Sequence, residues 1–210
     1  MKKKWLAILL LVMIWVFTGC GDNSGSVKEE SQQVRSQKTE ESQVQEEAVN
    51  TIQVGSKYKV TDTMEELKDS VVEILGKNYW PDTLLTEEEL AERVGISKNM
   101  YENFLAEYQH AEAGIDMMIL IEAKEKEVTH VETLLNDYRE MLLKIYERQP
   151  QNEAKVFASR IEVIDNYVCY VQLGADIAAL EEEGAEVMVD YCQQENERAL
   201  DILEKRILNS

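Results

Sequence analysis

Apolar residues recur with helical spacing in the first part of the region that we expect to fold. A helix is predicted over Asp62–Leu75, where residues at steps of three and four are apolar: Met64, Leu67, Val71 and Ile74. Thr86 and Glu89 have the spacing of a capping box and open a second, short helix that ends near Gly95. Ser97 can cap a third helix, with an inner face made of Tyr101, Phe104, Leu105 and Tyr108.

The pattern then changes to a strand and back to a long helix. Ile115–Ile121 is a short apolar run with β-branched residues, which predicts a buried strand. Helical spacing returns at Val128 and continues to about Arg148, before Pro150. The apolar positions of this helix are Val128, Val131, Leu135, Tyr138, Leu142 and Ile145. This stripe is short for a coiled coil, so it favours a helix with one face packed on a sheet.

A hairpin and a final helix complete the predicted domain. Val156–Ile164 alternates, Asp165-Asn166 suits a two-residue turn, and Tyr167–Val171 is almost wholly apolar. Ile177–Leu208 has a helical composition that Gly184 can interrupt, and its weak apolar stripe allows it to pack on the sheet or to project outward. The predicted order is α-α-α-β-α-β-β-α. This is an α+β fold with a small, antiparallel-rich three-stranded sheet that helices cover on one face.

The N-terminus has the pattern of a bacterial lipoprotein signal. Lys2, Lys3 and Lys4 precede the apolar run Trp5–Phe17, which is shorter than the roughly 20 residues that a spanning helix needs. Thr18-Gly19-Cys20 follows this run. After cleavage before Cys20, this residue would carry acyl chains on its sulfur and its amine, and two or more chains hold a protein firmly on a membrane. The alternatives are an uncleaved anchor, or a secretory signal followed by a chance cysteine.

These features divide the chain into three parts. Residues 1–19 are predicted to be a cleaved signal peptide, and residues 20–56 a lipidated, disordered tether. The tether is rich in Ser, Gln and Glu, so it cannot bury enough apolar surface to offset its ordering entropy. Residues 57–210 are long enough for one α+β domain with its own core. The expected location is the outer, extracytoplasmic face of the cell membrane.

The charge of the chain excludes two classes of partner. The chain has 22 basic and 41 acidic residues, and its formal net charge is −19. Removal of the three N-terminal lysines would make the mature chain still more acidic. Nucleic-acid binding needs a basic surface, and so does a polybasic contact with a membrane. Solubility at a crowded cell surface is the simplest role for this charge.

Part of the chain resembles a known family. The resemblance covers Leu85–Leu173 and rests on these segments: Leu90–Ser97, Met118–Lys124 and Asn166–Val171. This part of the chain is similar to an uncharacterised family of lipoproteins from clostridial and related Gram-positive bacteria. The family is known only as a domain of unknown function. The resemblance implies membrane anchoring. It implies no reaction and no site residues.

Candidate chemistry is sparse. The sequence has no Gly-x-Ser-x-Gly elbow, no glycine-rich phosphate loop and only two histidines. Glu107 and His110, like Glu127 and His130, have the Glu-x-x-His spacing of di-iron helical bundles. The strand predicted between these two pairs does not fit such a bundle. We therefore expect no enzyme activity, no metal and no cofactor.

Two further residue pairs leave alternatives open. Cys169 and Cys192 could form a disulfide in an oxidising compartment, but two buried free thiols are favoured. Arg148 and Arg160 could form an anion-binding spot beside Tyr167, but ordinary pairing with glutamates is favoured. The sequence thus predicts a lipid-anchored, non-catalytic module that binds a protein or envelope partner. The alternative is a solute- or ion-binding component of a transporter, which would need a cleft.

Overall fold

The structure is a computed structural model that describes residues 59–110 and 114–209. All of these residues belong to one compact unit, Thr51–Ser210. The predicted signal peptide, Cys20 and the whole predicted tether region lie outside the described residues, as do residues 57 and 58 of the predicted domain.

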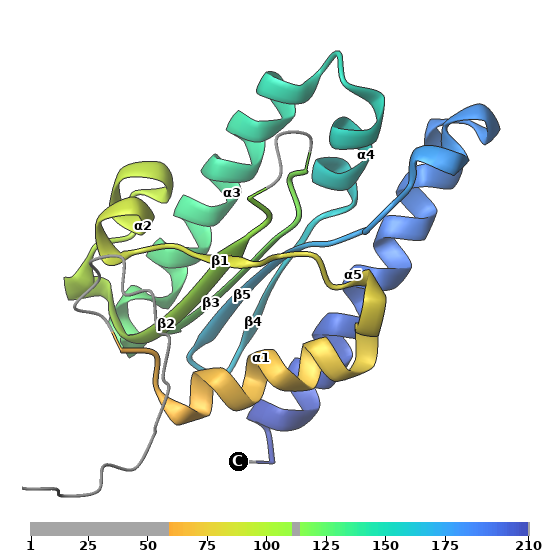
Figure 1. Ribbon diagram of the computed structural model, residues 1–210. Coiled ribbons are helices and arrows are strands. Elements are labelled where there is room, and N and C mark those ends of the chain that lie inside the picture. The colour runs from red at the N-terminus through yellow and green to blue at the C-terminus, as the bar shows by residue number, and fades with distance from the viewer. Residues whose placement is uncertain (1–58, 111–113, 210) are drawn as a thin grey trace, which may run out of the picture. The chain divides into compact units, whose positions relative to one another are not determined.

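A five-stranded antiparallel sheet forms the centre of this unit (Figure 1). Its order is β1-β2-β3-β5-β4, and the strands are β1 (Thr83–Leu84), β2 (Tyr101–Tyr108), β3 (Met117–Ala123), β4 (Arg160–Ile164) and β5 (Tyr167–Gln172). The prediction of a three-stranded sheet was therefore wrong, although the α+β class is confirmed. The sheet also contains β1, which lies between the first two predicted helices, and β2, which lies in the segment predicted as the third helix.

Helices cover both faces of the sheet. On one side lie α2 (Glu87–Val94) and α3 (Val128–Tyr146), and on the other lie α1 (Asp62–Leu75) and α5 (Ala185–Ile207) (Figure 1). The short helix α4 (Pro150–Ala158) contacts both α3 and α5. The expectation of one covered face was wrong because the final helix packs back on the sheet beside α1.

Each face of the sheet has its own core, since successive side chains of a strand point to opposite faces. In β3, Ile119 and Ile121 enter the first core with α2 and α3, whereas Met118 and Leu120 enter the second core with α1 and α5. All four of these side chains are fully buried. This two-sided burial explains why the central strand reads as a continuous apolar run.

The segment Tyr101–Tyr108 is a strand, and the predicted third helix was wrong. A register shift in β2 pairs Tyr101 with Ala123 and Asn103 with Glu122. This irregularity places Tyr101 and Phe104 in the same core, with ring centroids 5.1 Å apart. A β-bulge thus produced the step of three that imitates a helix.

The predicted strand over Val156–Ile164 begins four residues later than expected. Pro150 stands in the first turn of α4, where its missing N–H costs no hydrogen bond. The helix continues to Ala158, and only Arg160–Ile164 is strand. The hairpin turn at Asp165-Asn166 is confirmed, with Asp165 in the left-handed region at φ 54°.

Local end signals were reliable elsewhere. Helix α1 has its predicted bounds, and the Thr61 hydroxyl accepts a hydrogen bond from Met64 N at 3.4 Å. The capping box of α2 is formed in both directions between Thr86 and Glu89, at 3.1 and 2.9 Å. Gly184 separates a short 3₁₀ segment from α5, as the sequence indicated.

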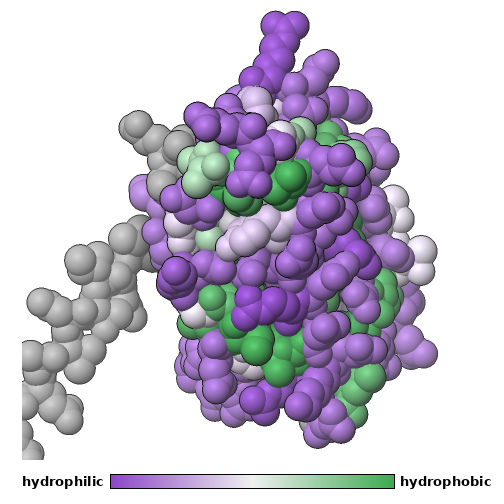
Figure 2. All heavy atoms as spheres, turned by 90° about the vertical axis from the view of Figure 1, so that its right-hand side faces the viewer, coloured by the Kyte–Doolittle hydropathy of each residue, from purple (hydrophilic) through white to green (hydrophobic). Residues whose placement is uncertain are grey.

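The outer surface is mainly polar. On the face seen in Figure 2, apolar side chains form several separate patches among polar ones. Among the described residues, no helix combines the length and the apolar character needed to cross a bilayer.

Candidate functional site

The two Glu-x-x-His pairs do not form a joint site. Glu107 lies in β2, where its carboxylate accepts a hydrogen bond from the Tyr79 hydroxyl at 2.7 Å. Glu127 precedes α3 and lies 3.5 Å from the exposed His130 ring. Across residues 59–110 and 114–209, no group of three or more His, Cys, Asp or Glu side chains could hold a metal ion.

The structure also separates Arg160 from Tyr167, and it places Cys169 and Cys192 in different apolar clusters. Arg160 lies opposite Val171 and forms an ion pair with Glu197 at 3.6 Å, whereas Tyr167 is at the other end of the hairpin. Cys169 and Cys192 are both buried and free, and they belong to different apolar clusters. Burial raises the pKa of each thiol to about 12, so neither is a reactive nucleophile at neutral pH.

A buried polar centre, which sequence analysis did not identify, lies where β3 begins and β5 ends. Its main pair is Asp116 and Lys155, with 2.5 Å between Oδ1 and Nζ. Asp116 is fully buried, and Lys155 is 5% exposed. The other oxygen, Oδ2, accepts hydrogen bonds from the backbone amides of Gly174, at 3.3 Å, and Ala175, at 3.0 Å. Burial raises the pKa of Asp116, while Lys155 and the two amides act in the opposite direction.

Local features of the chain bring these groups together. Ala175 has a φ of 48°, which turns the chain after β5 so that two successive amides face Asp116. A side chain at Gly174 would have no room, since its Cβ would lie 2.4 Å from the Cys192 sulfur. The partly buried Trp80 closes the outer side of the centre, with its ring centroid 5.3 Å from Lys155 Nζ.

Two amide side chains extend this centre into the elements around it. The Gln172 amide donates to the Ile115 carbonyl at 2.5 Å and accepts from the Tyr170 hydroxyl at 2.5 Å. Asn196, on α5, accepts from Leu173 N at 2.8 Å and donates to the Ala158 carbonyl at 3.0 Å. The polar groups therefore join β5, α4 and α5 in a region with little access to water.

A small cavity adjoins the centre on the side of the first core. Its volume is about 130 Å³, and its wall includes Arg93, Tyr108, Tyr138, Tyr146 and Gln172. The Arg93 guanidinium lies 5.0 Å from the Tyr108 ring centroid and pairs with Glu89 at 2.9 Å. Pockets that enclose small molecules usually hold roughly 300–1,000 Å³. This cavity is too small for a ligand of that kind.

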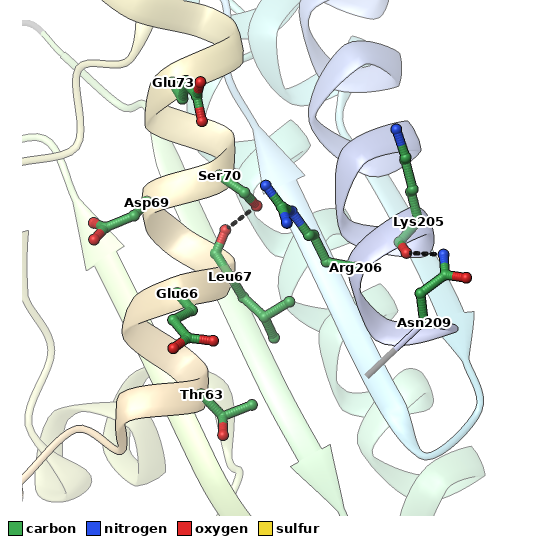
Figure 3. Close-up of a pocket in the computed structure, with 9 residues that line it drawn as sticks. All are labelled: Thr63, Glu66, Leu67, Asp69, Ser70, Glu73, Lys205, Arg206 and Asn209. Carbon is green, nitrogen blue, oxygen red and sulfur yellow. Dashed lines mark hydrogen bonds between the residues drawn. The ribbon is translucent and has the colours of Figure 1, made fainter.

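A larger open groove of about 680 Å³ runs between α1 and the end of α5 (Figure 3). The α1 wall consists of Thr63, Glu66, Leu67, Asp69, Ser70 and Glu73, and the α5 side consists of Lys205, Arg206 and Asn209. Arg206 reaches from α5 toward Ser70, whereas Asp69 points away from α5 (Figure 3). We call this the α1–α5 groove.

The charged groups of the α1–α5 groove are not paired with one another. Within the part of the chain that the structure describes, Arg206 forms no ion pair or side-chain hydrogen bond, and neither Glu66 nor Glu73 forms an ion pair. The Ser70 hydroxyl donates to the Leu67 carbonyl at 2.7 Å, which leaves its oxygen able to accept a further bond. The groove thus presents a guanidinium and carboxylates to solvent on facing helices.

Some of these residues carried a weak signal in the sequence. Asp116 is the single charged residue in the apolar run Ile115–Ile121, and a charge in a buried strand requires a partner. Lys155 gave no such signal, because it lies in a segment of mixed composition, 39 residues further along the chain. The groove could not be predicted, since the placement of α5 was left open.

Comparison with known families finds a DUF4358 domain, described as a domain of unknown function, at residues 78–173. The expected resemblance to a domain of unknown function is confirmed at this level, over almost the same residues. Neither the curated proteins nor the solved structures contain a match to this chain.

The matched residues contain the whole sheet but not the helices of its second face. Asp116, Lys155 and Trp80 lie inside the matched segment, as do both hairpin strands. Helices α1 and α5, and with them the α1–α5 groove, lie outside it. The buried polar centre thus belongs to the matched domain, whereas the α1–α5 groove lies outside it.

Proposed function

We propose that this chain is a lipid-anchored lipoprotein on the outer face of the cell membrane, and that its domain is a non-catalytic module that binds an envelope partner. The binding surface in this proposal is the α1–α5 groove. The observation that carries it is the unpaired Arg206 guanidinium, which points into the groove opposite the carboxylates of α1.

The sequence supports the anchor. Lys2–Lys4, the apolar run that follows and Cys20 have the order and lengths of a lipoprotein signal. The polar residues 20–56 would then separate the domain from the bilayer, so that a groove at the domain surface can reach material in the envelope. The acidic charge of the domain suits a module that stays away from an anionic membrane surface.

The chemistry of the groove indicates the class of partner. A guanidinium binds a carboxylate through two parallel hydrogen bonds, and Ser70 can add a further one. Glu66 and Glu73 favour an amine on the same ligand. A short peptide that carries both a carboxylate and an amine meets both requirements, whether it belongs to a protein or to another peptide-bearing envelope component.

A solute receptor is the weaker alternative. Such proteins enclose their ligand in a cleft, and the cavity beside Tyr138 has a volume of only about 130 Å³. The α1–α5 groove is open along its length, which suits an extended segment better than a small molecule.

Calorimetric titration of the purified full chain tests the groove. The probe is a synthetic pentapeptide with one lysine and a free C-terminal carboxylate, and its amidated form is the matched control. We expect Arg206→Glu to weaken binding of the free-acid peptide at least tenfold, because a charge-assisted hydrogen bond contributes roughly 1.5–3 kcal/mol. Arg148→Glu changes an exposed arginine outside the groove and should bind like the wild type. Equal affinity for both peptides, or an unaffected Arg206→Glu variant, would overturn the assignment.

A further inference from the structure

We propose that Lys155 and Asp116 condense to an intramolecular isopeptide bond, which links α4 covalently to the residue that precedes β3. This modification is independent of the proposed binding function. It rests on three observations: the distance between the two groups, the burial of both side chains, and the two backbone amides on Asp116 Oδ2.

The two reacting groups are already in contact. Lys155 Nζ lies 2.5 Å from Asp116 Oδ1, and both side chains are held on elements of the folded core. Where a fold holds an amine beside a carboxyl group, their reaction is intramolecular, and correct orientation can replace a very large concentration of free reactant. The pair therefore needs no separate enzyme to bring its members together.

The reactive form of the pair is the neutral one, and burial of Asp116 favours its carboxylic acid form. Asp116 is completely buried, and Lys155 is buried beneath the Trp80 ring. Two opposite charges are costly in such a setting, and the condensation requires the form of the pair in which Oδ1 carries the proton. The raised pKa of Asp116 agrees with this proton position.

The bond changes then balance without any other reactant. The lone pair of the neutral Nζ attacks Cγ, an N–C bond forms, and the electron pair of the carbonyl moves to Oδ2. The amides of Gly174 and Ala175, which already donate to Oδ2, stabilise the charge that develops there, as an oxyanion hole does. When this electron pair returns, the Cγ–Oδ1 bond breaks. Oδ1 leaves as water with its own proton and one from Nζ, and an amide remains.

The cross-link would close a loop that contains all of β3 and α3. The described part of the chain has no disulfide, and its two cysteines are buried and free. An amide bond at this position would restrict the conformations of the unfolded chain, as a disulfide does. Unlike a disulfide, it would resist reducing conditions. This property would suit a domain that is exposed outside the cell.

Peptide mass spectrometry of the purified full chain tests the proposal. Trypsin does not cleave after an acylated lysine, so residues 149–160 should remain whole and should be joined to residues 99–124. The expected mass is the sum of these two peptides less one water. We expect this linked species to account for more than half of the material.

An internal control is available in the same digest. Lys98 and Glu87 also form a close ion pair, but Lys98 is exposed, so residues 78–93 and 94–98 should appear separately and without loss of water. A Lys155→Arg chain should lose the linked species, because a guanidinium does not form this amide. Cleavage after Lys155 in most of the wild-type material, with unmodified residues 99–124, would overturn the proposal without reliance on any variant.

Discussion

Asn196 accepts a hydrogen bond from the backbone amide of Leu173, at 2.8 Å, where both residues are fully buried. The same side chain donates to the Ala158 carbonyl at 3.0 Å. One amide group therefore satisfies two backbone groups that β5 and α4 leave unpaired at their ends. This bridge ties α5, the helix whose placement the sequence left open, to elements of the sheet domain.

Removal of this bridge should destabilise the fold. We expect Asn196→Ala to lower the free energy of unfolding by about 2–3 kcal/mol, because it leaves a buried donor and a buried acceptor without partners. Urea unfolding followed by circular dichroism measures this change. Asn136→Ala is the matched control, since Asn136 is exposed on α3 and its amide only donates a hydrogen bond to the Glu132 carbonyl. A loss of the same size in both variants would contradict the structural role of Asn196.

Gly174 should tolerate no side chain while Cys192 is present. A Cβ at this position would lie 2.4 Å from the Cys192 sulfur, so Gly174→Ala should destabilise the protein by about 1–3 kcal/mol. In the double variant with Cys192→Ala, the sulfur is gone and the next contact is at 3.4 Å. The double variant should therefore lose less stability than the sum of the losses in the two single variants. Simple additivity in thermal unfolding would show that the close approach is not the cause.

Alkaline pH should weaken the fold through its buried thiols. Burial raises the pKa of Cys169 from its ordinary value of 9.0 to about 12. Between these two values the unfolded chain binds fewer protons than the folded chain, so the free energy of unfolding falls as the pH rises. At pH 10.5 this one thiol accounts for about 2 kcal/mol of the loss.

The Cys169→Ala variant isolates this effect. Its free energy of unfolding should fall less steeply than that of the wild type between pH 9 and 10.5, although the two slopes should agree near pH 7. Equal slopes over the alkaline range would mean that the Cys169 thiol ionises as easily in the folded protein as in the unfolded chain.

Membrane attachment should depend on residue 20. We expect Cys20→Ser to move the protein from the membrane fraction to the soluble fraction, because serine cannot receive the thioether lipid. In the wild type, the mass of the N-terminal peptide should exceed that of the mature sequence by its acyl chains. A Cys192→Ser chain serves as control for the loss of a cysteine elsewhere. Membrane recovery of the Cys20→Ser protein, together with an unmodified wild-type mass, would refute the anchor.

The features that could be predicted are those with short-range causes. Thr86 marks the first turn of α2 because a hydroxyl at that position satisfies free backbone amides of the same helix. Asp165 turns the hairpin because its side chain tolerates a left-handed backbone. The helical spacing of α3 also lies within the element itself, and this helix begins at Val128 as predicted, whereas β3 is shifted two residues beyond its predicted bounds.

The features that were missed have long-range causes. Tyr101 and Phe104 have helical spacing, yet pairing with β3 makes this segment a strand, and a bulge places both rings in one core. The second covered face arises because Leu200 and Leu203 of α5 return to the sheet, which a weak apolar stripe cannot reveal.

The sequence by itself determined the acidic charge, the limits of α1 and α2 and the two central strands β3 and β5, because each depends on residues that are close along the chain. Tertiary structure alone decided the two-faced sheet, the α1–α5 groove and the contact of Asp116 with Lys155. These depend on groups that are far apart in the chain, and burial of apolar surface on both faces of one sheet is what brings them together.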